Sequence, residues 1–108
     1  MILNKMDTDF GLRQTDVEKI RKTLIKYQEI EKAIVYGSRA KGNYKNNSDI
    51  DLTLVGEKLN SKIMNNLEWQ IDDLLLPYTF DISIMTQISN PDLVEHINRV
   101  GKVIYEKV

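Results

Sequence analysis

The chain has 108 residues, of which 42% are hydrophobic and 29% are charged. These proportions are those of an ordinary globular protein and exclude a disordered or fibrous chain, and the length predicts one domain spanning residues 1–108. The 15 basic and 16 acidic side chains give a net charge of -1, so no excess of positive charge favours binding to a nucleic-acid backbone, and no direct nucleic-acid partner is expected.

The start of the chain carries the charged residues Lys5, Asp7 and Asp9. These charges interrupt every apolar run, so the segment is neither a signal peptide nor a membrane span. The chain has no cysteine, which excludes disulfides, thiolate metal sites and cysteine nucleophiles and is compatible with a reducing compartment. We therefore expect a cytoplasmic protein.

An amphipathic helix is predicted over residues 15–31. Thr15 and Glu18 have the spacing of a capping box, in which each side chain bonds a backbone amide of the other residue. Apolar residues then recur at helical spacing as far as Tyr27, which gives the helix one face for a core.

Two short strands separated by a loop are predicted next. Residues 33–36 form an apolar strand, the run 37–42 breaks it, and residues 43–48 form a polar loop. Residues 50–55 then alternate with period two, which is typical of a strand with one buried face. The residues predicted to face the core are Ile50, Leu52 and Leu54, and those predicted to face away are Asp49, Asp51 and Thr53.

A second helix is predicted from a capping residue at Asn60 or Ser61 to Leu76, where Pro77 stops it. The residues on its apolar face are Ile63, Leu67, Ile71 and Leu74. Trp69 falls on the opposite face, where it either marks a partner surface or is covered by another element. The sequence leaves both interpretations of Trp69 open.

A third strand over residues 78–85 places Asp81 on the face opposite its apolar residues. Asn90 and Pro91 begin a last helix, Gly101 ends it, and a short terminal strand follows. This order of elements predicts an α/β or α+β layer fold, with a small mixed β-sheet flanked by helices.

Asp49 and Asp51 are two residues apart on a predicted strand, so their carboxylates project from one face. Neighbouring carboxylates repel each other, and a shared hard cation removes that cost. Oxygen ligands of this kind favour Mg²⁺ or Mn²⁺. The pair therefore predicts a metal site, and the alternative is a solvated face of an edge strand.

Gly37 and Ser38 close the preceding strand. Glycine lets backbone N–H groups approach a phosphate, and the serine hydroxyl can donate a further hydrogen bond. Because Mg²⁺ is usually held by one or two carboxylates plus substrate phosphates, this arrangement predicts a nucleoside triphosphate site. Asp81 would add a third carboxylate that helps to remove a proton from an acceptor hydroxyl. The alternatives are an ordinary turn at residues 37–38 and a surface position for Asp81.

The order Gly37-Ser38, ten residues, Asp49-Ile50-Asp51 resembles the signature of the DNA polymerase β type nucleotidyltransferase superfamily. The flanking residues are similar to the minimal nucleotidyltransferase proteins that are often paired with HEPN-domain ribonuclease toxins. The similar segments are Val35 to Gly42, Ser48 to Leu52, Phe10 to Leu12, Phe80 to Ile82 and Arg99 to Tyr105. The resemblance covers nearly the whole chain and implies the nucleotidyltransferase fold.

The resemblance also implies residue roles. The nucleotide-binding residues would be Gly37, Ser38 and Arg39, and the catalytic, metal-binding residues would be Asp49, Asp51 and Asp81, with two Mg²⁺ ions. Arg39 and Lys41 would either neutralise phosphate charge or be solvated loop cations. His96, the sole histidine, lies in the last predicted helix without a nearby ligand pattern and receives no role.

In relatives of this kind the implied activity is transfer of AMP from ATP to a tyrosine hydroxyl of a HEPN toxin, which inactivates the toxin. The chain would then be an antitoxin. A first alternative is an antitoxin that binds nucleotide and neutralises its partner by forming a complex without turnover. A second is a small-molecule enzyme that resembles the aminoglycoside-modifying enzymes, which generally carry extra sequence to bind the sugar.

Overall fold

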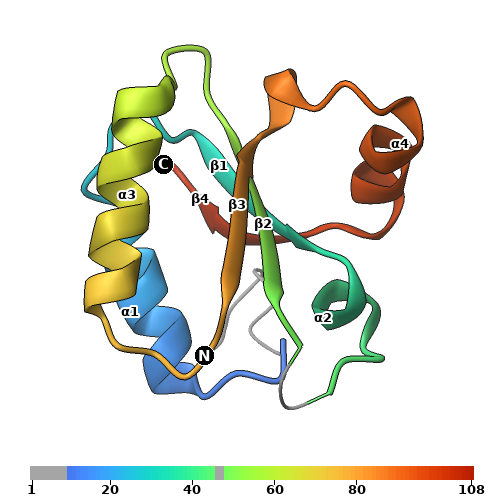
Figure 1. Ribbon diagram of the computed structural model, residues 1–108, viewed down its shortest axis with the longest axis horizontal. Helices are drawn as coiled ribbons and strands as arrows, with labels where there is room; N and C mark the ends of the chain where they lie inside the picture. The colour runs from blue at the N-terminus through green and yellow to red at the C-terminus, as the bar shows by residue number, and fades with distance from the viewer. Residues whose placement is uncertain (1–9, 46–47) are drawn as a thin grey trace.

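A computed structural model of the chain describes residues 10–45 and 48–108 (Figure 1). The elements in chain order are α1 (Gln14–Leu24), β1 (Lys32–Tyr36), α2 (Ser38–Lys41), β2 (Ile50–Val55), α3 (Ser61–Asp73), β3 (Phe80–Ile84), the 3-10 turn η1 (Met85–Gln87), α4 (Pro91–Val100) and β4 (Lys102–Glu106). The predicted order of helices and strands is confirmed, and the four-residue helix α2 stands where only a turn was predicted. No helix of the described residues is long and apolar enough to cross a lipid bilayer.

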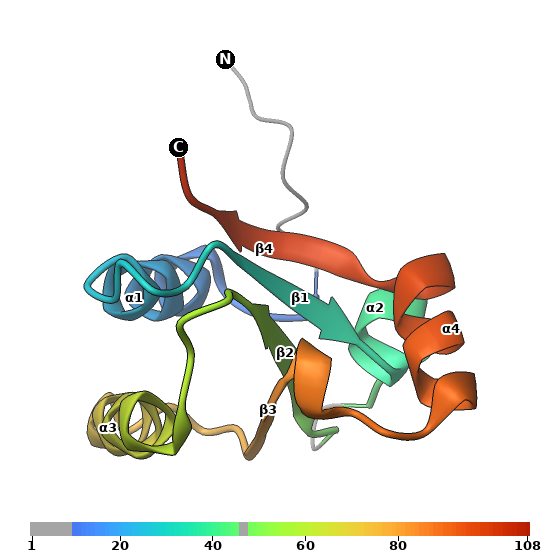
Figure 2. The ribbon, with the colours of Figure 1, turned by 90° about the horizontal axis from the view of Figure 1, so that it is seen from above.

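The four strands form one sheet in the order β3-β2-β1-β4. β2 pairs with β3 in parallel, whereas β1 pairs with β2 and with β4 in antiparallel. The sheet is thus mixed, as predicted. Figure 2 shows α1 and α3 on one face of this sheet, and α2 and α4 on the other.

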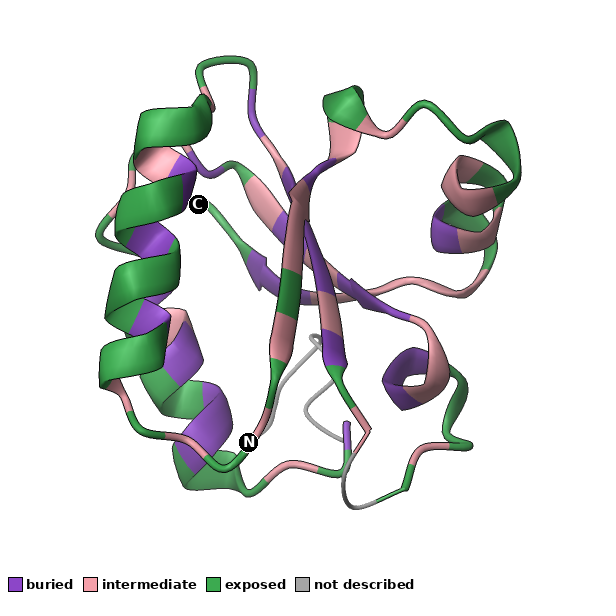
Figure 3. Ribbon diagram, viewed as in Figure 1, coloured by how far each residue is buried: buried purple, intermediate pink, exposed green. Residues whose placement is uncertain are grey.

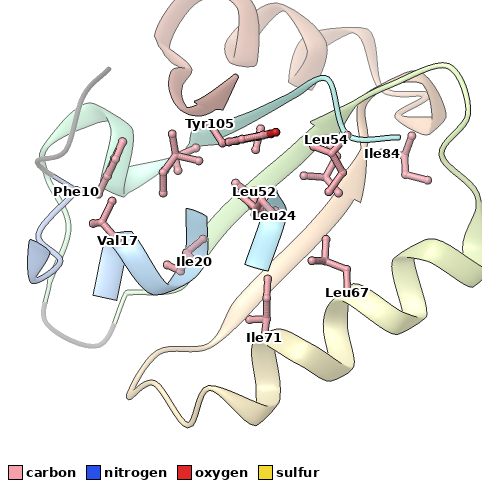
Figure 4. Packing of buried hydrophobic residues seen from close by; sticks show 14 of the residues in the cluster. Phe10, Val17, Ile20, Leu24, Leu52, Leu54, Leu67, Ile71, Ile84 and Tyr105 are labelled. Atoms are coloured by element: carbon pink, nitrogen blue, oxygen red, sulfur yellow. The ribbon is translucent and has the colours of Figure 1, made fainter. Parts of the chain in front are cut away.

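The main core lies between the sheet and the pair α1 and α3. The predicted alternation in β2 is confirmed, because Ile50, Leu52 and Leu54 are each at most 1% exposed. Leu67 and Ile71 of α3 meet the strands in this core (Figure 4). Figure 3 shows the same division along α3, whose buried stripe faces the sheet while the rest of the helix is exposed. Asp51 and Thr53 consequently lie on the face that α1 and α3 leave free.

Helix α1 is shorter than predicted. It ends at Leu24 instead of residue 31, and Arg13 precedes it without a side-chain capping bond, so the predicted capping box of Thr15 is wrong. Tyr27 still packs against the core from the turn that follows. That contact explains why the apolar spacing continued past the end of the helix.

Helix α3 begins as predicted, because the Asn60 side chain accepts a hydrogen bond from the Ile63 amide at 2.9 Å. It ends at Asp73 instead of Leu76. Leu75 has a φ of 56°, and this left-handed turn lets Leu76 return to pack against the core. The sequence has no glycine near residue 75 from which the end of α3 could be predicted.

The last helix and strand agree with the sequence. The Asn90 side chain accepts a hydrogen bond from the Asp92 amide at 2.9 Å, with proline in the first turn of α4. Gly101 ends α4 and leads directly into β4.

Replacement of Leu75 by glycine is expected to raise the free energy of unfolding by about 0.5–1 kcal/mol. Glycine adopts a left-handed conformation without the Cβ clash that leucine makes, and Leu75 is 87% exposed, so little burial is lost. Urea unfolding measures the change. The control is Ile25→Gly, at the right-handed C-cap of α1, which should lose about the same amount because glycine disfavours a helical conformation. Equal effects of the two variants would refute strain at Leu75.

Candidate active site

Two predicted carboxylates meet on the free face of the sheet. In the parallel pairing of β2 with β3, Asp51 is the register partner of Asp81. Asp51 is half-buried and Asp81 is exposed. Asp49 is exposed and lies directly before β2. The structure therefore brings the three predicted carboxylates to one end of two adjacent strands.

The pKa of the Asp51 carboxyl is raised above its usual value. Burial is the largest cause, and the negative charges of Asp81 and then Asp49 add to it. His96 has the opposite, smaller effect. A carboxylate held near two others is destabilised in its charged form, so this group of acids favours a cation beside it.

Hydroxyl groups lie next to the carboxylates on the same face. The Ser83 hydroxyl donates a hydrogen bond to the Thr53 hydroxyl at 3.0 Å. Tyr36 is the register partner of Asp51. Burial raises the pKa of the Tyr36 hydroxyl, and the nearby Ser83 acts to lower it. The acids thus stand beside a neutral polar network that the sequence did not predict.

Gly37 makes the turn that follows β1. Its φ of 73° and ψ of -152° belong to a region that is essentially restricted to glycine. A Cβ at this position would overlap the Asp51 carboxylate. Ser38 is the first residue of α2. The structure therefore places the predicted phosphate-binding turn against the predicted metal-binding carboxylate.

His96 reaches the same turn from α4, although the sequence assigned it no role. The Gly37 amide donates a hydrogen bond to His96 Nε2 at 3.3 Å, and the imidazole meets the Tyr36 ring edge-on, with the centroids 6.3 Å apart. The hydrogen bond joins residues 59 positions apart. Only the tertiary structure could reveal such a contact.

The environment of Arg39 excludes one of its two sequence interpretations. Its side chain is 1% exposed, so it is not a solvated loop cation. The guanidinium donates hydrogen bonds to the Phe10 carbonyl at 2.8 Å and to the Ser48 carbonyl at 3.1 Å. It also lies over the rings of Tyr44 and Tyr78, at 5.2 and 5.4 Å from their centroids. This buried position favours a structural role over the predicted contact with nucleotide.

Two other residues singled out in the sequence are exposed. Lys41, in the last turn of α2, is exposed and agrees with a solvated cation. Trp69 is 77% exposed, so no described element covers it. It lines a groove of about 670 Å³ between α3 and the edge strand β3, together with Glu68 and Asp72. This groove is available to a partner and is separate from the carboxylates.

Within residues 10–45 and 48–108, no three carboxylate or imidazole groups are arranged to hold a metal ion together. The donor chemistry nevertheless fits Mg²⁺, which is usually held by one or two carboxylates and completes its shell with water and substrate phosphates. Asp51, with Asp81 as register partner and Asp49 nearby, supplies such a partial set. The residues therefore fit an ion that binds together with a nucleotide.

A protein-family model matches most of the chain. The model described as polymerase beta, nucleotidyltransferase matches residues 18–108, which is most of the chain. The chain belongs to the polymerase beta nucleotidyltransferase family. The mixed sheet with its flanking helices is accordingly the predicted nucleotidyltransferase fold.

Solved structures share this fold with the new nucleotidyltransferase. A crystal structure of a toxin-antitoxin with AMP-PNP aligns with a TM-score of 0.69 at 20% identity, over 84% of this chain and 73% of the other. A tri-AMPylated HEPN toxin in complex with MNT antitoxin, from Shewanella oneidensis, aligns with a TM-score of 0.66 at 17% identity, over 89% and 74%. A putative nucleotidyltransferase from Sulfolobus solfataricus gives 0.52 at 17% identity, over 84% and 77%. No curated protein matches the sequence.

Removal of the Arg39 side chain is expected to destabilise the nucleotidyltransferase. Arg39→Ala leaves the buried Phe10 carbonyl and the part-buried Ser48 carbonyl without their charged donor and should lower the free energy of unfolding by about 3 kcal/mol. Arg39→Lys should recover only part of this loss, because an ammonium group lacks the planar fork. The matched control is the exposed Lys41→Ala, expected within about 0.5 kcal/mol of wild type. Full stability of Arg39→Ala with lost nucleotide binding would restore the original prediction.

Asp51 should make the metal-free enzyme less stable as the pH rises. Its pKa is raised in the folded state above 3.8, so the folded protein binds this proton more tightly and stability falls as the pH passes from the unfolded to the folded pKa. Asp51→Asn removes that loss. In EDTA, its urea midpoint should exceed that of wild type at about pH 7 and approach it at about pH 4. The exposed Glu57→Gln should match wild type at both pH values. If Asp51→Asn shows no gain in urea midpoint at about pH 7, the raised pKa of Asp51 is contradicted.

Proposed function

We propose that this chain is a Mg²⁺-dependent nucleotidyltransferase that transfers AMP from ATP to a tyrosine hydroxyl of a HEPN ribonuclease toxin, and that it acts in the cytoplasm as the antitoxin. The observation that carries the proposal is the close approach of the Gly37 turn to Asp51, whose register partner is Asp81. A glycine turn against a carboxylate pair suits a triphosphate and its cation. Family membership supports the transfer chemistry.

Each residue then has a defined task. Gly37 and Ser38 would hold the triphosphate, while Asp49, Asp51 and Asp81 would hold Mg²⁺. The bound cation would neutralise phosphate charge during the displacement. In the reaction the acceptor oxygen bonds to the α-phosphorus, pyrophosphate leaves, and the hydroxyl proton passes to the Asp81 carboxylate. Asp81 is suited to this task because it is exposed on the edge strand.

The proposed partner is supported by the structural neighbours. One neighbour is a toxin-antitoxin with AMP-PNP, and another holds a tri-AMPylated HEPN toxin with its MNT antitoxin. Residues 1–108 are proposed to form one domain, and a tyrosine of the toxin would reach Asp81, which is exposed on the edge strand. The exposed Trp69, beside the acidic side chains Glu68 and Asp72, offers a surface on which a basic region of that toxin could bind.

A second candidate function is an antitoxin that binds nucleotide and neutralises the toxin by forming a complex, without turnover. This function needs only the Gly37 turn beside Asp51 to hold a nucleotide, and needs no acid to remove the acceptor proton. Both candidates require the glycine turn to bind nucleotide. They differ only in whether the toxin is covalently modified.

Intact-mass analysis of a candidate HEPN toxin, incubated with this protein, ATP and Mg²⁺, distinguishes the two. Transfer should add one or more AMP masses to the toxin. Asp49→Asn should reduce the rate by more than about a hundredfold, because it removes a ligand of the charge-neutralising cation. Peptide mapping then identifies the modified hydroxyl.

The matched control is Asp73→Asn, an exposed acid at the end of α3, which should transfer AMP at the wild-type rate. Undiminished transfer by Asp49→Asn would refute the metal assignment. No mass gain, with a stable toxin complex still formed, would establish the sequestering antitoxin.

A further inference from the structure

The sole histidine of the chain bonds the backbone of the proposed phosphate-binding turn. The Gly37 amide is the donor and His96 Nε2 is the acceptor, at 3.3 Å. A ring nitrogen accepts a hydrogen bond only when it carries no proton, so this contact requires the tautomer with its proton on Nδ1. His96 thus contributes a hydrogen-bond acceptor to the turn.

The turn at Gly37 needs such a constraint. Glycine loses more backbone freedom on folding than any other residue, and the conformation at Gly37 is one that other residues essentially never adopt. The ladder of β1 with β2 ends at the pair Tyr36 and Asp51, one residue earlier. The bond to His96 therefore ties the turn down just beyond the last strand pair.

The imidazole is itself held in place by the packing of α4. Ile97, the next residue, is 2% exposed. Gly101, at the end of α4, lies so close to the strand that a Cβ there would overlap Ile34 of β1. The Tyr36 ring meets the imidazole edge-on. A side chain supported on two sides in this way can fix the position of the group it bonds.

We propose that His96 is a positioning residue of the nucleotide site: by accepting the Gly37 amide proton, it holds the turn that presents Ser38 to the triphosphate. This inference rests on the proposed nucleotide-binding function. The turn contacts phosphate both before and during transfer, so the loss of His96 weakens nucleotide binding more than it slows the chemical step. KM for ATP then rises while kcat changes less.

Three variants distinguish the effect of the hydrogen-bond acceptor of His96 from the effect of its aromatic ring. His96→Phe keeps an aromatic edge against Tyr36 but offers no acceptor, whereas His96→Gln places an amide oxygen near the position of Nε2. With Mg²⁺ and AMP-PNP, the Kd should rise about three- to tenfold in His96→Phe, which corresponds to one lost hydrogen bond. It should stay within about twofold of wild type in His96→Gln. The exposed Asn98→Ala on the same helix should bind as wild type does. Equal Kd values for the Phe and Gln variants would overturn the proposal.

A second measurement needs no nucleotide and separates this inference from the proposed function. Because the chain has one histidine, the imidazole ¹⁵N NMR signals are unambiguous, and at about pH 8 they should show a protonated Nδ1 and an unprotonated Nε2. Amide hydrogen exchange at Gly37 should be faster in His96→Phe than in wild type and slower again in His96→Gln. The Nε2-protonated tautomer, or identical exchange in all three proteins, would overturn the role of His96. Failure of the wild-type protein to bind AMP-PNP would instead refute the nucleotide site, while the exchange data still decide whether His96 holds the turn.

Discussion

The parallel pairing of β2 with β3 determines where chemistry takes place in this domain. It makes Asp81 the register partner of Asp51, and it requires the chain to cross over through α3 on one face of the sheet. That face becomes the core, because the apolar residues of both strands point into it. The acidic residues then have only the other face available. Burial on one face and function on the other are therefore two results of a single strand pairing.

A network of buried polar contacts connects the site to distant parts of the chain. Arg39, one residue after Ser38, bonds the Phe10 carbonyl and lies over the Tyr78 ring. The Tyr78 hydroxyl donates a hydrogen bond to Asp16 of α1 at 2.9 Å. The start of α2 is thus coupled to the segment before α1 and to the approach to β3. Such buried charges must remain satisfied, so these contacts anchor the segment that carries Gly37 and Ser38.

Local pattern was enough to predict the strands and the face on which Asp51 and Asp81 lie, and not enough to predict the surroundings of these acids. The alternation of apolar and polar residues around Asp51 and Asp81 is a local sequence pattern, so both faces of β2 and β3 could be assigned from the sequence. The ends of α1 and α3 depend on where Tyr27 and Leu76 pack against the core. Residue spacing along a helix does not predict these contacts. His96 and Arg39 form hydrogen bonds with residues 59 and 29 positions away, so no local motif could predict these contacts.

The steric contact between the Gly37 turn and Asp51 has a consequence for how the family signature should be understood. A side chain at position 37 would occupy the space of the Asp51 carboxylate, and the φ of 73° already restricts this position to glycine. The glycine of the signature is therefore required for two separate reasons, its own backbone conformation and the nearby carboxylate. A mutant library built on this domain should keep glycine at position 37 even where position 51 is varied, because a smaller residue at 51 would remove the overlap but not the backbone restriction.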